Sequence, residues 1–459
     1  MSERLNLRTL DQVPAEIGRP DYDVANLGVG IVHLGLGAFH RAHQAVFTED
    51  AIHAAGGNWG IAGVSLRHAD AAEALNPQDG LYAVETLAES GALRVVGVLR
   101  QALAAGVDPE GVVAVMAAPT THIISLTVTE KAYRLDAAGE VDLAHPEIVH
   151  DLARPDRPMS AVGWLTLGLA QRRNQGGAPM TVISCDNLIG NGRKLEAAVR
   201  TLADRWDPTL AKWIETEVAF PQTMVDCIVP ATSEISRARI EAALGLRDQA
   251  CVSREAFAQW VIEDRFAGPR PAWELAGVEF VADVAPYERL KLHVLNAAHS
   301  ALAYLGLKQG RALVRETIAD PEISRFVDAL MAEEIAPALP DLPVADYWRT
   351  ARARFANPRL DHRLTQIGED GSSKLAQRIY PLLIANAHAG RSTKHMETVI
   401  RAWLDLAGQG QVADPQADRL QAWTSSGCDG AKILEDSSLF PDAFRTEPAL
   451  RRTLLRSAG

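Results

Sequence analysis

The chain has 459 residues, which is more than one hydrophobic core usually organises, so we expect two domains. Its apolar content of 47% and charged content of 23% are typical of a soluble globular protein. The formal net charge of −12 argues against nucleic acid or an anionic membrane as a partner.

Targeting and redox signals are absent from the sequence. No apolar run reaches the roughly 18 residues of a membrane-spanning helix, and the N-terminus lacks the apolar stretch of a signal peptide. The cysteines show no metal-type pairing, and we expect them to be reduced in a cytoplasmic protein. They are Cys185, Cys227, Cys251 and Cys428.

The first strong signal along the chain is a glycine turn that follows a polar arm over residues 1–28. Residues 31–34 are apolar and predict a short buried strand, and a helix is expected from about Ala42 to Ala55. Between them stand Gly35 and Gly37. Strand, Gly-x-Gly and helix form the context of a dinucleotide site, because the glycines let the backbone approach a pyrophosphate. The third glycine of the common fingerprint is replaced by His40, so an ordinary tight turn is equally consistent with this pattern.

The second predicted strand, residues 59–67, ends without the acid that binds the ribose of NAD. Ser65 and Arg67 stand there, and the nearest acid is Asp70. An arginine at this position can bind the 2′-phosphate of NADP, although Arg67 can equally be a solvated loop residue.

Further strands carry polar residues at their carboxyl ends, which face the ligand in such sheets. The strand from His122 ends at Thr129 and Glu130, which we assign to the cofactor cleft. The strand from Met180 runs into a turn that holds Asn187, and the apolar run after Phe220 contains Asp226. Taken alone, Asn187 is also an ordinary turn or capping residue.

Helical patterns replace strand patterns beyond about residue 284. The first of these helices, residues 288–306, is apolar but includes Lys291, Asn296 and His299. On a regular α-helix these three fall within an arc of roughly 140°, so they can face one cavity. Burial disfavours the ammonium form, which is what a lysine general base requires. Each residue alone also has a structural explanation, but their combination favours a catalytic one.

This helix, Lys-x4-Asn-x2-His followed by Ser-Ala-Leu-Ala-Tyr-Leu-Gly, resembles the signature of the polyol-specific long-chain dehydrogenases, which include mannitol 2-dehydrogenases and fructuronate reductases. The glycine turn, the Ser-Cys-Asp-Asn segment before Leu188, the Trp260 segment and the Asp-Gly-Ser-x-Lys-x3-Arg segment also resemble this family. Cys227 stands where the family usually has arginine. The resemblance extends from about residue 30 to about residue 400.

The resemblance implies an α/β fold with a Rossmann-like NAD-binding domain over residues 1–283, followed by a mostly helical catalytic domain over residues 284–459. It also implies NAD as the cofactor, with NADP as the alternative, and a small-molecule polyol, ketose or sugar acid as substrate. The expected cofactor-binding residues are Gly35, Gly37, Ala38, Phe39, Arg67, Thr129 and Glu130. The expected substrate-binding residues are Asp226, Arg363, Lys374 and Arg378.

The expected chemistry needs no metal. Lys291 takes the proton of the substrate hydroxyl, and Asn187 and Asn296 donate hydrogen bonds to its oxygen. His299 binds a substrate hydroxyl or holds Lys291. Glu288 passes the proton to solvent, or is only an acid favoured at a helix start.

The sequence leaves several alternatives open. A mannitol-type polyol is slightly favoured as substrate, with fructuronate next because of the His362-Arg363 pair. A dinucleotide-binding protein without chemistry predicts loss of Lys291 or its asparagine partners, and all are present. A zinc alcohol dehydrogenase predicts clustered cysteine ligands, which are absent. Monomer and small homo-oligomer are both compatible with the sequence.

Overall fold

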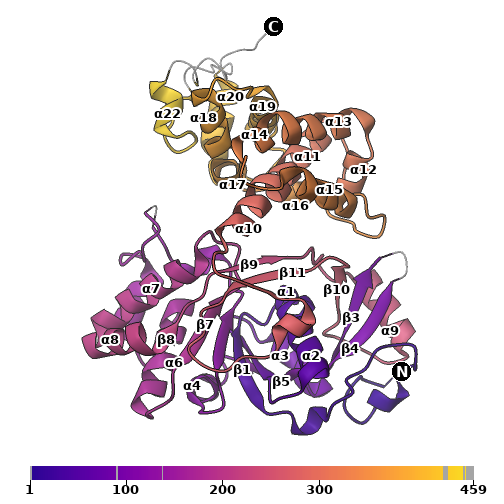
Figure 1. Ribbon diagram of the computed structural model, residues 1–459, viewed down its shortest axis with the longest axis vertical. Coiled ribbons are helices and arrows are strands. Elements are labelled where there is room, and N and C mark those ends of the chain that lie inside the picture. The colour runs from indigo at the N-terminus through magenta and orange to yellow at the C-terminus, as the bar shows by residue number, and fades with distance from the viewer. Residues whose placement is uncertain (1–2, 89–90, 137, 427–432, 448–449, 451–459) are drawn as a thin grey trace. The chain divides into compact units, whose positions relative to one another are not determined.

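The computed structural model describes residues 3–88, 91–136, 138–426, 433–447 and 450. The chain divides into two compact units, Met1–Ala285 and Pro286–Gly459 (Figure 1). Each unit has its own hydrophobic core. The first unit combines a parallel sheet with helices, and the second is helical. The predicted fold class is therefore confirmed.

A six-stranded sheet organises the first unit, with all neighbouring strands parallel in the order β5-β2-β1-β6-β7-β8. Strands β2 and β5 extend to one side of β1, and β6, β7 and β8 extend to the other. Such a switch point is where open α/β sheets bind ligands. The strands are β1 (Val29–Leu34), β2 (Gly60–Ser65), β5 (Leu99–Ala104), β6 (Ile123–Leu126), β7 (Met180–Ser184) and β8 (Val218–Ala219).

Both faces of this sheet are buried. In β1, Ile31 belongs to one hydrophobic cluster and Val32 to another, and Ile123 and Ile124 divide in the same way in β6. Because successive strand residues point to opposite faces, helices cover the sheet on both sides. The helices of this unit are α1 (Ala38–Ala42), α2 (Gln44–Ala55), α3 (Asp70–Leu75), α4 (Pro109–Ala117), α5 (Pro146–Ala153), α6 (Ala161–Asn174), α7 (Asn191–Trp206), α8 (Pro208–Glu217) and α9 (Glu234–Leu244).

The helix after the glycine turn differs from its prediction. It begins at Ala38 rather than near Ala42, and it breaks at His43, where φ is −124° and ψ is −87°. Two small sheets complete the unit, with strand orders β10-β3-β4 and β12-β11-β9. Their strands are β3 (Tyr82–Leu87), β4 (Ala92–Val96), β9 (Thr223–Asp226), β10 (Val252–Glu255), β11 (Gln259–Glu263) and β12 (Glu279–Val281).

The second unit is built around α11, which packs against α16 and α19. Two of its helical turns are π-helical, η6 (Lys291–Asn296) and η7 (Leu330–Ile335). The helices are α10 (Ala285–Leu290), α11 (Ala297–Lys308), α12 (Val314–Ile318), α13 (Pro321–Ala329), α14 (Ala336–Ala338), α15 (Val344–Phe355), α16 (Leu364–Gly368), α17 (Gly371–Arg378), α18 (Tyr380–His388), α19 (Lys394–Gly408), α20 (Ala417–Ser425) and α22 (Asp442–Thr446).

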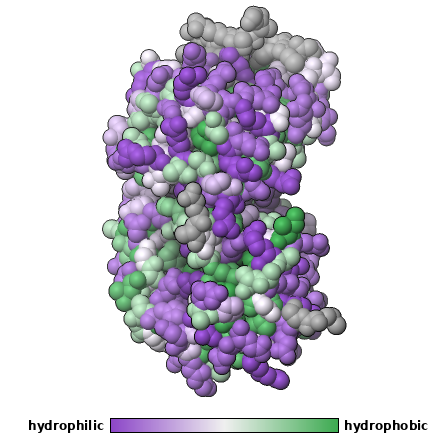
Figure 2. Space-filling model, turned by 90° about the vertical axis from the view of Figure 1, so that its right-hand side faces the viewer, coloured by the Kyte–Doolittle hydropathy of each residue, from purple (hydrophilic) through white to green (hydrophobic). Residues whose placement is uncertain are grey.

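The surface and the cysteines agree with an ordinary globular chain. The face that Figure 2 presents is mostly hydrophilic. Within the described ranges, no helix has the length and apolar character needed to span a bilayer. Cys185, Cys227 and Cys251 are free thiols, and Cys428 lies outside the described residues.

Candidate active site

The glycine turn is fixed by its contacts with β2 and β6. Gly35 has φ +98°, and a Cβ atom there would lie 2.1 Å from the carbonyl oxygen of Thr127, so only glycine fits. The buried His33 ring holds the same region, with its nitrogens 2.8 Å from the hydroxyls of Ser125 and Thr127. The Thr127 hydroxyl in turn donates to the carbonyl oxygen of Gly35 at 3.0 Å.

Gly37 has a different reason to be glycine. Its φ is −94°, and a Cβ atom there would have only the Gly35 carbonyl oxygen nearby, at 3.8 Å. The protein itself therefore leaves room for a side chain at Gly37. The open space at this exposed backbone is what the close approach of a phosphate would require.

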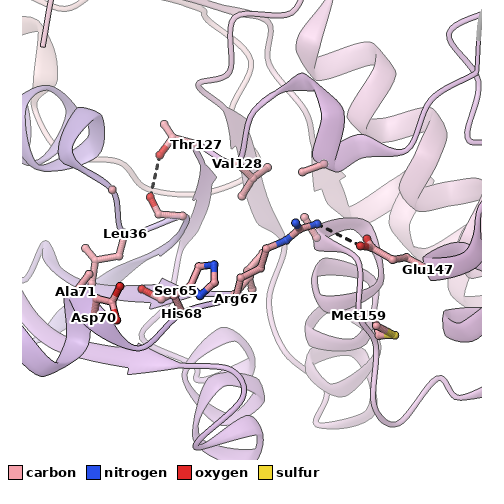
Figure 3. A pocket seen from close by; sticks show the side chains of 15 residues that line it. Leu36, Ser65, Arg67, His68, Asp70, Ala71, Thr127, Val128, Glu147 and Met159 are labelled. Carbon is pink, nitrogen blue, oxygen red and sulfur yellow. Dashed lines mark hydrogen bonds and ion pairs between the residues drawn. The ribbon is translucent and has the colours of Figure 1, made fainter. Parts of the chain in front are cut away.

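A cavity of about 340 Å³ lies at the carboxyl ends of β1, β2 and β6 (Figure 3). The glycine turn forms part of its wall, and it is also lined by Ser65 at the end of β2 and by Arg67 and Asp70 beyond it. Thr127 and Val128 line it after β6. The cavity thus occupies the switch point of the sheet, and both predicted glycines, Gly35 and Gly37, line it together with Arg67.

An arginine pair surrounds Glu147 at the rim of this cavity. Arg134 binds the carboxylate through two nitrogens, at 2.6 and 2.8 Å, whereas Arg67 makes one contact at 3.1 Å. Partial burial opposes ionisation of Glu147, but the hydrogen bonds and charge of Arg134, helped by Arg67, hold its pKa below the usual value. Arg67 remains 62% exposed.

The other predicted residues of this unit are not part of the cavity lining. Thr129 and Glu130 are exposed and follow the part of the chain that lines the cavity. Asn187 is exposed in the loop after β7, and Asp226 is buried at the end of β9. In α1 the Phe39 ring stacks on His43, with ring centroids 5.1 Å apart.

The signature helix of the second unit is not regular. The π-helical turn η6 covers Lys291 to Asn296, so the angular positions assumed for a regular α-helix do not hold there. Lys291 and Glu288 are half-buried, whereas Asn296 and His299 are each only 8% exposed. π-Helical turns occur frequently at functional sites, because they shift side chains out of the helical register.

Arg378 contacts the signature helix directly. Its Nη1 donates to the carbonyl oxygen of Asn296 at 3.1 Å and to the hydroxyl of Ser300 at 3.0 Å. The Arg378 carbonyl oxygen lies 3.0 Å from Nδ1 of His293. Two helices are therefore joined at the turn that carries Lys291 and Asn296.

His299 lies in a buried and positively charged environment. Its ring contacts those of Phe355 and His362, with centroids 4.4 and 5.2 Å apart. Burial, followed by the charges of His362, Arg378, Arg354 and Lys374, holds the pKa of His299 well below its usual value. Burial and Lys374 also lower the pKa of His362 to about 4. Both rings are therefore neutral near pH 7.

The remaining predicted cations lie on the same unit. The Lys374 ammonium donates to the carbonyl oxygen of Ile367 at 3.0 Å, and Arg363 is exposed before α16. Among the described residues, no three His, Cys, Asp or Glu side chains are grouped closely enough to hold a metal ion.

The sheet order, the glycine turn and the cavity define the first unit as a dinucleotide-binding domain of the Rossmann type. Two family models agree: the mannitol dehydrogenase Rossmann domain matches residues 29–275, and the mannitol dehydrogenase C-terminal domain matches residues 283–452. The chain belongs to the mannitol dehydrogenase family, and it is an oxidoreductase that acts on CH–OH groups.

Relatives with assigned activities cover most of the chain. D-mannonate oxidoreductase of Escherichia coli is 41% identical over 93% of this chain and 92% of its own. Mannitol 2-dehydrogenase of Cereibacter sphaeroides is 40% identical over 84% and 82%. The structure of Pseudomonas fluorescens mannitol 2-dehydrogenase, a ternary complex with NAD and D-mannitol, has a TM-score of 0.89 and 34% identity over 99% of this chain and 96% of that one.

Sequence reasoning did not single out Glu147, and it did not recognise that Asp186 is buried beside Thr129. The sequence does place Asp186 at the ligand edge of the sheet, since it follows two residues after a buried strand, but its hydrogen bond with Thr129 spans 57 residues. Glu147 gave none, because it reaches the cavity from a helix 80 residues beyond Arg67.

Proposed function

We propose that the chain is an NAD-dependent dehydrogenase that interconverts a polyol secondary alcohol and a ketose, with D-mannitol and D-fructose as the first candidate pair. The observation that carries the proposal is the glycine-walled cavity at the switch point of the sheet, in a chain that matches a mannitol 2-dehydrogenase bound to NAD and D-mannitol over 99% of its length. The alternative is a non-catalytic dinucleotide-binding protein, which would not require Lys291.

The residues of the first unit fit a dinucleotide. The open space at the Gly37 backbone suits a pyrophosphate, and the cavity is continuous with Ser65 and Arg67, where a ribose would lie. We assign cofactor binding to Gly35, Gly37, Ala38 and Phe39, with the neighbouring Thr129 and Glu130 as further candidates. The bound nicotinamide would accept or return the hydride.

The proton chemistry is assigned to Lys291. A carbinol carbon releases hydride only as its oxygen loses a proton, so a base must act at that oxygen. The neutral amine of Lys291 would take this proton, and Glu288, one helical turn earlier, would pass it to solvent. The half-buried positions of both residues suit groups that must reach substrate on one side and water on the other.

The oxygen of the substrate needs donors as its negative charge develops. We propose the side-chain amides of Asn296 and Asn187 for this role. His299 is neutral near pH 7 because its pKa is lowered by burial and then by the surrounding cations, so it can donate one hydrogen bond and accept another. This property suits recognition of a substrate hydroxyl. Asp226, Arg363, Lys374 and Arg378 are proposed to bind the rest of the substrate.

The deciding experiment is spectrophotometric. Purified protein with NAD+ and D-mannitol should produce the reduced-nicotinamide absorbance, and reduced cofactor with D-fructose should consume it. Lys291→Ala is the matched catalytic variant. A protein that binds NAD+ but turns over none of a panel of polyols, ketoses and keto-uronates would be a binder rather than an enzyme.

A second candidate function is oxidation of D-mannonate to D-fructuronate. The observation that favours it is a set of three cations near His299, whose charges lower the pKa of its ring: Arg354, Lys374 and Arg378. A sugar acid needs a fixed cation for its carboxylate, whereas a polyol needs only neutral donors and acceptors. D-mannonate oxidoreductase of Escherichia coli, at 41% identity, agrees with this candidate.

Catalytic efficiency on fructose against fructuronate separates the two candidates. A preference of about 100-fold for the uronate corresponds to roughly 3 kcal/mol, which one charge-assisted pair can supply. The preference should then collapse in Lys374→Ala or Arg378→Ala, which remove cations of this set. An equal or higher efficiency on fructose would leave the polyol as the substrate.

A further inference from the structure

The cavity offers the adenosine end of the cofactor two kinds of recognition group. Ser65 ends β2, where an acid normally binds the ribose diol of NAD. Asp70 lines the cavity at the start of α3, and Arg67 lines it beyond Ser65. In Figure 3 the Arg67 side chain extends toward Glu147 and away from Asp70. An acceptor for a diol and a cation for a phosphate are thus both present.

The ion pair of Arg67 leaves this cation available. Glu147 is bound through both carboxylate oxygens by Arg134, at 2.6 and 2.8 Å, so its charge stays compensated if Arg67 moves. Arg67 contributes a single contact at 3.1 Å and is 62% exposed, and an exposed pair of this kind is weak. Two arginines facing one carboxylate also leave a net positive charge on this side of the cavity.

We propose that the protein accepts NADP as well as NAD, with Arg67 as the cation that binds the 2′-phosphate and Asp70 as the acceptor for the 2′-hydroxyl. Ser65 has a hydroxyl and no charge, so it accommodates either cofactor at the end of β2. A guanidinium binds a phosphate through two parallel hydrogen bonds, which its single contact with Glu147 does not provide. This inference rests on the proposed function only in its choice of cofactor pair.

Fragment binding tests the subsite without any turnover. The full chain should bind adenosine 2′,5′-bisphosphate at least as tightly as 5′-AMP, measured by calorimetry. Arg67→Ala should weaken the bisphosphate at least tenfold more than it weakens 5′-AMP. Arg173→Ala, which removes an arginine paired with Asp207 at 2.8 Å outside the cavity, is the matched control and should change neither. Equal weakening of both fragments by Arg67→Ala would overturn the assignment.

Steady-state efficiencies complete the test. The ratio of kcat/KM with NADP to that with NAD should be one-tenth or more in the wild type, fall at least tenfold in Arg67→Ala, and rise in Asp70→Asn. A wild-type ratio below one-tenth, or a ratio that Arg67→Ala leaves unchanged, would contradict the proposal. If no substrate turns over with either cofactor while the fragments still discriminate, the proposed function fails and the subsite assignment stands.

Discussion

The buried carboxylate of Asp186 accepts the backbone N–H of Thr129 at 2.7 Å. Thr129 has φ +71°, in a region that favours glycine and costs other residues about 1–3 kcal/mol. Asp186 also accepts the Tyr133 hydroxyl at 2.8 Å. One carboxylate after β7 therefore holds the strained loop after β6, and this loop continues from the residues that line the cavity.

Asp186 should make the stability of the first unit depend on pH. Burial raises its pKa to about 6 from 3.8, although the hydrogen bonds from Tyr133 and Thr129 oppose the rise. Between these two values the folded state binds more protons than the unfolded state, so the contribution of Asp186 to stability falls as pH rises through this window. At pH 7, where Asp186 is ionised, its contribution to the free energy of unfolding is about 3 kcal/mol lower than at a pH where it is protonated in both states.

The matching substitution is Asp186→Asn, which keeps an oxygen for the Thr129 N–H. The difference in unfolding free energy, wild type minus variant, should decrease by roughly 2–3 kcal/mol from pH 4 to pH 7.5. Hydrogen exchange of residues 123–126 and 180–184 at increasing urea concentration measures this difference for the first unit. Exposed Asp418→Asn serves as control, and a difference independent of pH would refute the assignment.

Substitutions of the two glycines of the turn should have different effects on stability. Gly35→Ala should destabilise the first unit by about 2 kcal/mol or more, because a Cβ would meet Thr127 at 2.1 Å with φ at +98°. Gly37→Ala has no such collision, since the nearest atom is 3.8 Å away, so the melting temperature should stay within a few degrees.

Cofactor binding then separates the roles of the glycines. NAD affinity should fall at least tenfold in Gly37→Ala, because the new methyl group occupies the approach to the pyrophosphate. Fluorescence titration measures this affinity. If Gly37→Ala binds NAD like the wild type, the phosphate lies elsewhere.

Local sequence patterns predicted β1 and the glycine turn of the first unit well. A buried strand, two glycines and a helix are contiguous in the chain, so β1 and its turn needed no long-range information. The π-helical turn η6 could not be predicted in this way, because apolar spacing does not distinguish a bond to the fourth residue from a bond to the fifth over one turn. Arg378 and Asn296 are 82 residues apart in the chain, and no local pattern in either segment predicts their contact.

Arg378 should stabilise the signature helix whether or not it also contacts substrate. The lysine of Arg378→Lys ends one bond short of the position of Nη1, so its ammonium should not reach both the Asn296 carbonyl and the Ser300 hydroxyl, and the helical unit should lose roughly 2 kcal/mol. Arg419→Lys, at an exposed pair with Asp436, is the control. Hydrogen exchange of residues 297–308 in urea measures the effect, and equal stability of the two variants would remove this role.

The kinetics of Arg378→Lys distinguish positioning from substrate binding. If Arg378 acts through the π-helical turn, kcat should fall while the substrate KM changes by less than about threefold. A rise of KM tenfold or more at unchanged kcat would instead identify a direct contact with substrate. Fructuronate and fructose should both be tested, because a lost carboxylate contact would affect the uronate alone.

Lys291→Ala should lower turnover by on the order of 100-fold or more while NAD still binds, because proton removal at the substrate oxygen loses its base. The matched control is Lys308→Ala, on the same helical run but in an exposed pair with Asp405 at 2.6 Å.

The pH profile of Lys291→Ala adds a test that damage to the fold would not mimic. Wild-type kcat/KM for alcohol oxidation should rise with pH through the pKa of the base, since only the neutral amine accepts a proton, and this limb should vanish in Lys291→Ala. External amines such as methylamine should restore part of the lost rate, by acting as the base in the space that the side chain leaves. A variant with near-normal turnover, or with the same ascending limb, would assign the base to another residue.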